Sequence, residues 1–193
     1  MEISPRSIVL AYIIGVALVD GNLSNPNSRA IRLRITCDAK YPRLAKEIEG
    51  KLRYLLPKNK VSIVRVPQKD SYFNISVYSN RFDQWLPWKV GQGPKEKQQV
   101  RIPSWIKKEI VFSRACVRGL LQTDGSIYMD RGYCMINFTN IVYPLARDVY
   151  RALQKLGYRP TFSSTPVKSK QKYTVRIAKD SYRVIKELAL YKA

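Results

Sequence analysis

Residues 13–21 read IIGVALVDG, and residues 117–125 read VRGLLQTDG. Each stretch is an apolar segment with an inner glycine, and each ends in Asp-Gly at the same distance from that glycine. The second copy begins 104 positions after the first (117 − 13), which is about half of the 193 residues. This spacing predicts an internal duplication that presents one carboxylate in each half of the chain, Asp20 and Asp124.

Charge sets the class of partner. The chain has 35 Lys and Arg residues against 14 Asp and Glu residues, which gives a formal net charge of +21. Repulsion of this size opposes folding unless a polyanion shares the charge. Nucleic acid is the commonest such partner, and counterion release would supply much of the affinity. The hydrophobic content of 45% is typical of a globular protein rather than a disordered one.

Histidine is absent, which excludes Ser-His-Asp and Cys-His catalysis and nucleases that use a histidine base. The cysteines Cys37, Cys116 and Cys134 are scattered and form no CxxC pair. This usage predicts reduced core thiols in an intracellular protein without a zinc site. Residues 8–19 are apolar but too short for a membrane span, which needs about 20 residues, and no secretory signal is visible. We expect a buried helix and no membrane partner.

The first half begins with a helix over 7–19 that has Ser4 or Ser7 as its N-cap, followed by polar residues at 21–28. Residues 30–36 alternate apolar and polar side chains, the pattern of a sheet with one buried face. The remaining elements expected from periodicity and turn residues are a strand at 30–37, a helix at 41–56, strands at 60–66 and 72–78, and a short helix at 80–86.

The second half repeats this organisation. It predicts a helix at 113–123 with Ser113 as N-cap, strands at 126–128 and 133–139, a helix at 143–156 ending at Gly157, strands at 158–164 and 172–178 around a lysine-rich turn, and a helix at 180–190. Residues 87–105 carry three prolines, two glycines and a polar run, which is typical of a linker whose end, 101–106, anchors the second motif helix. We therefore predict an α+β fold of two αββαββα halves, 1–86 and 113–193, joined by a linker at 87–112.

The two motifs and the repeated element order resemble the single-chain LAGLIDADG homing endonucleases. The second copy, Gly119 to Gly125, is a good match. The first copy, Gly15 to Gly21, is looser because Leu18 stands where the family often has an acidic or polar residue. The resemblance covers essentially the whole chain. It implies two pseudo-twofold-related halves packed through their motif helices, with a saddle of antiparallel β-sheet.

Two motif helices that pack side by side need small residues where their backbones approach, such as Gly15, Ala17 and Gly119. Their final carboxylates, Asp20 and Asp124, would then lie at adjacent helix ends near the pseudo-twofold axis. A carboxylate at a helix C-terminus faces the negative end of the helix dipole, and a bound cation offsets that cost.

Mg²⁺ binds through carboxylates, water and phosphate oxygens. The resemblance implies two or three Mg²⁺ ions held by Asp20 and Asp124, with the backbone carbonyls of Val19 and Thr123 as further ligands. Mn²⁺ or Ca²⁺ can substitute, and we expect Ca²⁺ to bind without turnover. Such ions activate water and stabilise the leaving oxygen of each scissile phosphate.

In the family the strands lie along the DNA major groove, where base edges are distinguishable. Alternation places Ile31, Leu33 and Ile35 in the core and their neighbours on the DNA side, and the other strands are assigned in the same way. Loop lysines are assigned to phosphate contacts, because half or more of protein–DNA hydrogen bonds go to phosphate and sugar. The resulting DNA-binding candidates are Arg32, Arg34, Thr36, Lys69, Tyr72, Asn74, Ser76, Tyr78, Tyr133, Met135, Asn137, Thr139, Lys168, Lys170, Lys172, Thr174 and Arg176.

The family also places polar or basic residues around the metal ions. Asn140 follows the second strand threonine and suits a water-orienting role, whereas Cys37 and Asp38 depart from the Gln or Lys often found in the first half. A basic residue commonly follows the last helix of each half, and Lys89 and Lys192 occupy those places. The resemblance therefore implies a catalytic set of Asp20, Asp124, Asn140, Lys89 and Lys192.

These features favour a monomeric endonuclease that binds a long, asymmetric DNA duplex. It would cut both strands across the minor groove and leave 5′-phosphate and 3′-hydroxyl ends. An intron RNA maturase of the same fold is the main alternative. A DNA-binding regulator with inactive carboxylates is disfavoured by retention of both aspartates. A basic structural protein, such as a ribosomal one, would need no paired Asp-Gly motifs.

Overall fold

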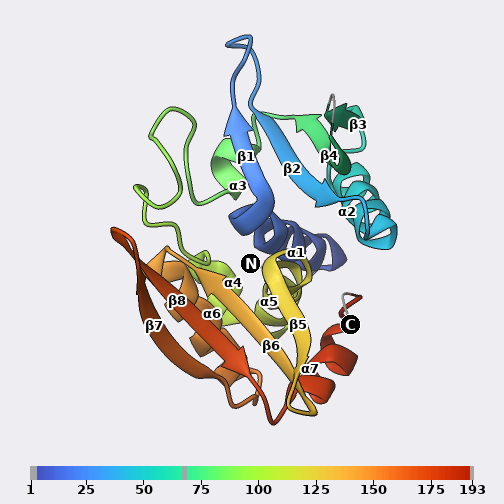
Figure 1. The fold of residues 1–193 in the computed structure, drawn as a ribbon. Helices are drawn as coiled ribbons and strands as arrows, with labels where there is room; N and C mark the ends of the chain where they lie inside the picture. Colours follow the sequence, from blue (N-terminus) through green and yellow to red (C-terminus); the bar gives the residue numbers. More distant parts are fainter. Residues whose placement is uncertain (1–3, 67–68, 192–193) are drawn as a thin grey trace.

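The computed structural model describes residues 4–66 and 69–191. In this part of the chain two α/β halves lie on either side of a central pair of helices, α1 and α5 (Figure 1). In Figure 1 the strands of both halves lie toward the viewer, with α6 behind the second sheet and α2 and α7 at the right-hand edge of the molecule. The predicted α+β architecture of two similar halves is confirmed.

In the described residues the first half consists of seven elements, and all of them except β1 have bounds close to the predicted ones. They are α1 (Pro5–Asp20), β1 (Gly21–Ser24), β2 (Arg32–Asp38), α2 (Pro42–Leu55), β3 (Val61–Val66), β4 (Lys69–Tyr78) and α3 (Phe82–Trp85). Ser4 is the N-cap of α1, because its Oγ accepts a hydrogen bond from the Ser7 amide at 3.2 Å.

The second half follows a short helix within the expected linker. Its elements are α4 (Ser104–Lys108), α5 (Ile110–Asp124), β5 (Gly125–Asp130), β6 (Tyr133–Asn140), α6 (Tyr143–Lys155), β7 (Thr161–Val167), β8 (Lys170–Ile177) and α7 (Ser181–Leu188). Gly157 follows α6 with a φ of 81°, the left-handed conformation expected of a glycine at a helix end.

Each half forms an antiparallel sheet with the same topology. In the described residues the strand orders are β1-β2-β4-β3 and β5-β6-β8-β7. Each motif helix runs directly into the first strand of its sheet, so that Gly21 pairs with Ile35 and Gly125 pairs with Phe138. Glycine is needed here because a side chain would not fit, and not because of an unusual φ. A Cβ on Gly21 would lie 2.5 Å from the Ala17 carbonyl oxygen.

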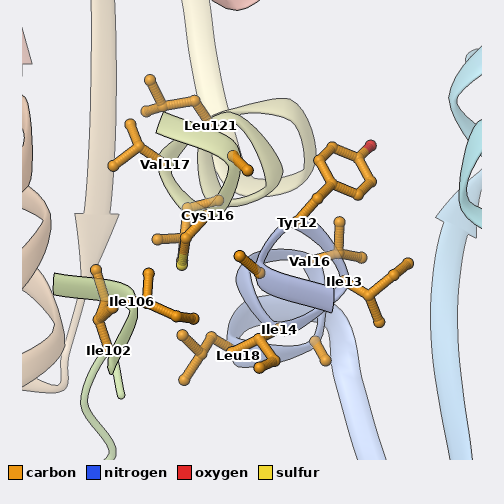
Figure 2. Packing of buried hydrophobic residues seen from close by; sticks show 14 of the residues in the cluster. Tyr12, Ile13, Ile14, Val16, Leu18, Ile102, Ile106, Cys116, Val117 and Leu121 are labelled. Atoms are coloured by element: carbon orange, nitrogen blue, oxygen red, sulfur yellow. The ribbon is translucent and has the colours of Figure 1, made fainter. Parts of the chain in front are cut away.

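The two motif helices touch through their backbones. A Cβ on Gly15 would lie 2.2 Å from the carbonyl oxygen of Cys116, and one on Gly119 would lie 2.4 Å from that of Tyr12. Figure 2 shows the two helices close together, with Ile102 and Ile106 of the linker region beside the pair. Both isoleucines are buried, which confirms the expected anchor ahead of the second motif helix.

Polar contacts join the linker and the halves. The Asp148 carboxylate of α6 is only 2% exposed and accepts bonds from the Arg101 and Lys107 side chains and from the Ile102 amide. Across the halves, the Arg118 guanidinium of α5 donates to the Glu47 carboxylate of α2 at 2.9 Å. The linker is therefore packed into the fold rather than loosely tethered.

Several expectations about local structure were wrong. Residues 21–24 form β1 instead of a polar loop, because they pair with residues 32–35 of β2. Ser113 is not an N-cap, since α5 begins at Ile110 and the Ser113 hydroxyl donates to the Ile106 carbonyl. The expected lysine-rich turn is mostly strand, because β7 extends to Val167 and β8 starts at Lys170.

A candidate metal and nucleic-acid site at the ends of the motif helices

The two candidate carboxylates are the last residues of the two central helices. Asp20 ends α1 and is partly buried, and Asp124 ends α5 and is exposed. Because the helices are in backbone contact at Gly15 and Gly119, five residues earlier in each, both helix ends emerge from one shared axis. The two aspartates thus end adjacent helices, as predicted, and their role as metal ligands stays a prediction.

A cavity of about 350 Å³ adjoins Asp20, and we name it the N-terminal cavity. Ile48 and Leu44 of α2 form part of its apolar wall, and Thr123 enters it from the other motif helix. Its polar lining residues are Asp20, Thr36, Asp38, Tyr41, Ser71, Tyr72 and Thr123. Cys37 also lines it, and burial together with the Asp20 charge raises the pKa of its thiol to about 12. Burial therefore favours the neutral thiol of Cys37 over the thiolate.

A second cavity, of about 380 Å³, adjoins Asp124, and we name it the C-terminal cavity. Its relation to the helices mirrors the first, because Leu18 and Val19 enter it from the opposite motif helix. Asn140 lines this cavity, and its Oδ1 accepts a hydrogen bond from the Val142 amide at 2.9 Å. Sheet register makes Asn140 the counterpart of Cys37, since Phe138 and Ile35 pair with the equivalent glycines.

Lys95 is a functional candidate that the sequence analysis missed. Its ammonium lines the C-terminal cavity and donates to the carbonyl oxygens of Ala17, Leu18 and Val19 at 2.7, 3.0 and 3.0 Å. It thereby caps the C-terminus of α1, where a positive charge is favourable. Burial lowers the pKa of Lys95 to about 8, while the charges of Asp20 and Asp124 act in the opposite direction.

Of the two basic residues predicted for this site, Lys89 has a different position. Lys89 lies on the surface, where its ammonium contacts the Asp83 carboxylate at 3.1 Å and the Asp83 carbonyl. Lys95, six residues later, occupies the place near the carboxylates that was assigned to Lys89. The long Lys95 side chain reaches the helix ends from the linker, and no sequence motif indicates this contact. Lys192 lies outside the described residues.

The donor set fits a hard divalent cation that is completed by substrate. Among the described residues, no group of three His, Cys, Asp or Glu side chains is arranged to hold a metal ion. The described residues offer one helix-end carboxylate in each half, with Thr123 of the opposite helix lining the first cavity and Val19 of the opposite helix lining the second. Mg²⁺ commonly binds through one or two carboxylates together with water and phosphate oxygens. The residues therefore fit Mg²⁺ only as a partner of a phosphate-bearing ligand.

The open face of the first sheet carries the expected polar side chains. Arg32 and Arg34 are partly exposed and Thr36 is exposed, while Leu33 and Ile35 are buried, as alternation predicts. Asn74 and Ser76 depart from this expectation, because each is only 8% exposed. They lie on the central strand β4 between neighbours on β2 and β3, and Asn74 Oδ1 accepts a bond from Thr36 Oγ1 at 3.0 Å. Tyr72 is partly exposed and Tyr78 is exposed.

The second sheet carries a connected polar network on its open face. Arg176 donates to Asn137 Oδ1 at 3.2 Å, and Asn137 Nδ2 donates to the Tyr128 hydroxyl at 2.9 Å. The hydroxyls of Thr139 and Thr174 lie 3.3 Å apart. Tyr133 is exposed and Met135 is partly exposed on the same strand. Tyr128 is a further member of this surface that alternation over 133–139 alone did not identify.

Lysines gather near the β7–β8 turn. Lys168, Lys170 and Lys172 are exposed, and Lys170 forms an ion pair with Glu96 of the linker. Lys69 begins β4, but its side chain lies outside the described residues. In the described part of the chain, no helix combines the length and the apolar character that a membrane crossing requires.

Comparisons with known proteins agree with this geometry. Residues 112–189 match the family model described as a LAGLIDADG-like domain. The structure of I-DmoI in complex with DNA and Ca has a TM-score of 0.70 and 19% sequence identity, covering 96% of this chain and 91% of that chain. The complex of I-DmoI with DNA and Mn has a TM-score of 0.68 at 19% identity, covering 95% and 97%.

The similar structures also include the protein DUF199/WhiA. Full-length DUF199/WhiA from Thermatoga maritima has a TM-score of 0.64 and 13% identity, covering 97% of this chain and 57% of that chain. A search of curated proteins gave no match. The resemblance inferred from the two motifs is confirmed, by the family model in the C-terminal half and by the shared fold over both halves.

Proposed function

We propose that this chain, a LAGLIDADG protein with two motif helices, is a monomeric, divalent-metal-dependent endonuclease that cuts both strands of a DNA duplex. The observation that carries the proposal is the arrangement at the helix ends. Asp20 and Asp124 end two helices in backbone contact, and Lys95 lies within electrostatic reach of both carboxylates. Paired carboxylates beside one amine are not needed for binding a polyanion, because they repel its phosphates.

We assign metal binding to one set of residues and DNA binding to another. Asp20 and Asp124 would hold Mg²⁺, with carbonyl oxygens of Val19 and Thr123 as further donors. When bound, the metal supplies Lewis-acid stabilisation of the scissile phosphate and lowers the pKa of a water molecule. Asn140 would orient water in the C-terminal cavity, and Lys95 would offset negative charge near both aspartates. The chain has no histidine, and burial favours the neutral thiol of Cys37, so no covalent intermediate is proposed.

The open sheet faces support a long and asymmetric target. The first sheet presents Arg32, Arg34 and Thr36, whereas the second presents Tyr133, Asn137 and Arg176. Arginine and asparagine side chains can read bases by bidentate hydrogen bonds in the major groove. Since the two surfaces differ in sequence, the target need not be palindromic. The exposed lysines of the β7–β8 turn would contact phosphates.

The test is cleavage of a randomised DNA duplex library with and without Mg²⁺. The wild type is compared with Asp20→Asn and Asp124→Asn, which remove one negative charge each and keep the shape of the side chain. Asp83→Asn is the matched control, because Asp83 is exposed and pairs with Lys89 away from the helix ends. We expect discrete Mg²⁺-dependent double-strand cuts in the wild type and the control, and none in the two other variants.

Three results would overturn the proposal. Selective duplex binding without cleavage, unchanged by Asp20→Asn and Asp124→Asn, would leave a DNA-binding protein on this fold. The absence of selective duplex binding, combined with affinity for structured intron RNA, would favour the maturase alternative. Cleavage that persists in both variants would place the reaction elsewhere on the chain.

A further inference from the structure

The two cavities share one frame but differ in charge. Asp38 lines the N-terminal cavity in addition to Asp20, and none of the described residues that line this cavity is basic. In the C-terminal cavity, Lys95 lines the space together with Asp124 and Glu96. Position 38 is equivalent to Ile141 by sheet register, so the extra carboxylate has an apolar counterpart in the other half.

We propose that Asp38 is a further metal-positioning residue and that it makes the N-terminal cavity the first site to take a divalent cation. The inference deepens the proposed function by ordering the occupation of its two cavities. It stands on cation binding alone, so it can be tested without DNA cleavage.

Among the described residues, no ion pair is formed by Asp38, so its charge can act on a cation in the cavity. Its Oδ1 accepts a hydrogen bond from the Lys40 amide at 2.9 Å, which fixes the side chain at the end of β2. A backbone amide orients a carboxylate but does not neutralise it. A second negative charge near Asp20 therefore raises the affinity of this cavity for a cation, directly or through bound water.

Lys95 has the opposite effect in the C-terminal cavity. Its ammonium interacts with Asp20 more strongly than with Asp124, but it lines the C-terminal cavity and does not line the N-terminal cavity. It also donates to the Val19 carbonyl, one of the oxygens available to a metal beside Asp124. A cation that enters here must meet a resident positive charge and compete for that oxygen. The second site therefore fills at a higher metal concentration.

The tyrosines of the N-terminal cavity provide a direct readout. Tyr41 and Tyr72 line it, whereas the described lining of the C-terminal cavity contains no aromatic residue. Tb³⁺ is a hard, oxygen-seeking cation whose luminescence is sensitised by a nearby tyrosine. Titration of the full chain with Tb³⁺, with tyrosine excitation, reports binding in the N-terminal cavity. Trp88 lies against Lys95 and could also sensitise Tb³⁺. Its contribution is identified by recording the Tb³⁺ emission at excitation wavelengths where only tryptophan absorbs.

We expect a tight, tyrosine-sensitised phase that Mg²⁺ displaces. Asp38→Asn should weaken it about tenfold, equivalent to about 1.4 kcal/mol, and Asp20→Asn should abolish it. Asparagine keeps the Oδ1 that accepts the Lys40 amide, so the fold is retained. Asp124→Asn and the surface control Asp83→Asn should leave the phase unchanged. Tyr41→Phe with Tyr72→Phe should reduce the emission without changing the affinity.

The failures are distinguishable. A tight phase that is lost in Asp124→Asn and unchanged in Asp38→Asn would overturn the inference, even if the protein cleaves DNA as proposed. A tight phase that responds to Asp38 in a protein that cuts no duplex would preserve the inference and overturn the nuclease. Lys95→Met should tighten binding in the C-terminal cavity, with Lys97→Met, an exposed linker lysine, as the matched control.

Discussion

The N-terminal and C-terminal cavities are built by the same backbone and finished by different side chains. Each lies beside the carboxylate that ends one motif helix and receives residues from the other helix. The end of strand β2 supplies Cys37 and Asp38 to one cavity, whereas Asn140 at the end of strand β6 and the following Ile141 line the other. The two halves thus share the helix pair and the sheet register, while the residues around the carboxylates differ. The backbone that the two cavities share depends on close helix packing, whereas the cavities differ in the charged side chains that line them.

The largest expected effect comes from breaking the shared frame itself. In Gly15→Ala the new methyl group would lie 2.2 Å from the Cys116 carbonyl oxygen, and in Gly119→Ala 2.4 Å from that of Tyr12. Backbone atoms of a packed helix cannot move aside cheaply, so we expect each variant to lose about 3 kcal/mol or more of unfolding free energy. Gly50→Ala in helix α2 is the control, since its Cβ would meet nothing within 4 Å. It should stabilise the protein by about 0.5–1 kcal/mol.

Urea unfolding followed by circular dichroism measures all three variants. Equal losses in the two motif variants would support a symmetric helix pair. A tolerated Gly15→Ala with a folded, fully stable protein would show that the helices do not approach as described.

The second effect concerns the buried carboxylate that only the second half uses. Asp148 receives Arg101, Lys107 and the Ile102 amide while 2% exposed. Asp148→Ala leaves the buried Ile102 amide without its acceptor and removes the partner of two solvent-accessible cations, so we expect a loss of about 2–3 kcal/mol in thermal or chemical unfolding. Asp83→Ala, which breaks an exposed pair with Lys89, should cost about 1 kcal/mol or less. A similar small cost for both would mean that the linker is not held by Asp148.

Sequence periodicity predicted most of the helices and strands, because the spacing of apolar residues indicates which side chains are buried. The alternation of residues 30–36 identified the buried positions Leu33 and Ile35, and the Asp-Gly repeats located both helix ends. It failed at Asn74 and Ser76, where polar side chains are buried by neighbouring strands instead of by the core. It also failed at Lys95, because a linker side chain reaches the carboxylates through a path that has no periodic signal.

The third effect tests whether Lys95 is buried beside the carboxylates. Its pKa is lowered to about 8 in the folded protein, while an unfolded lysine titrates near 10.4. Between these values the unfolded chain binds more protons, so the stability of the wild type should rise with pH relative to Lys95→Met. The relative gain should be on the order of 2 kcal/mol by pH 10.5. Subtracting Lys95→Met removes the contributions of cysteines and tyrosines that titrate in the same range.

Unfolding at several pH values from 7 to 11 provides the measurement, with Lys97→Met as the control for a surface lysine. A wild type that loses stability relative to Lys95→Met over this range would mean that the ammonium is stabilised in the folded protein. In that case the hydrogen bonds to the α1 carbonyls, rather than burial, would set its pKa.

The smallest effect comes from the one buried position at which the two motif helices differ most in polarity. Gln122 of α5 corresponds to Leu18 of α1, and both are fully buried. Within the described residues, Gln122 Nε2 has no hydrogen-bond partner, and its Oε1 accepts only a long bond of 3.4 Å from the Tyr191 amide. Gln122→Leu would copy the first helix into the second and remove the cost of an unpaired amide. We expect a gain of about 1 kcal/mol, measured as a rise in Tm, whereas Leu18→Gln should lose at least as much. If Gln122→Leu instead destabilises the protein, the amide has a structural role in the second half that the first half lacks, and the helix pair is less symmetric than its glycines indicate.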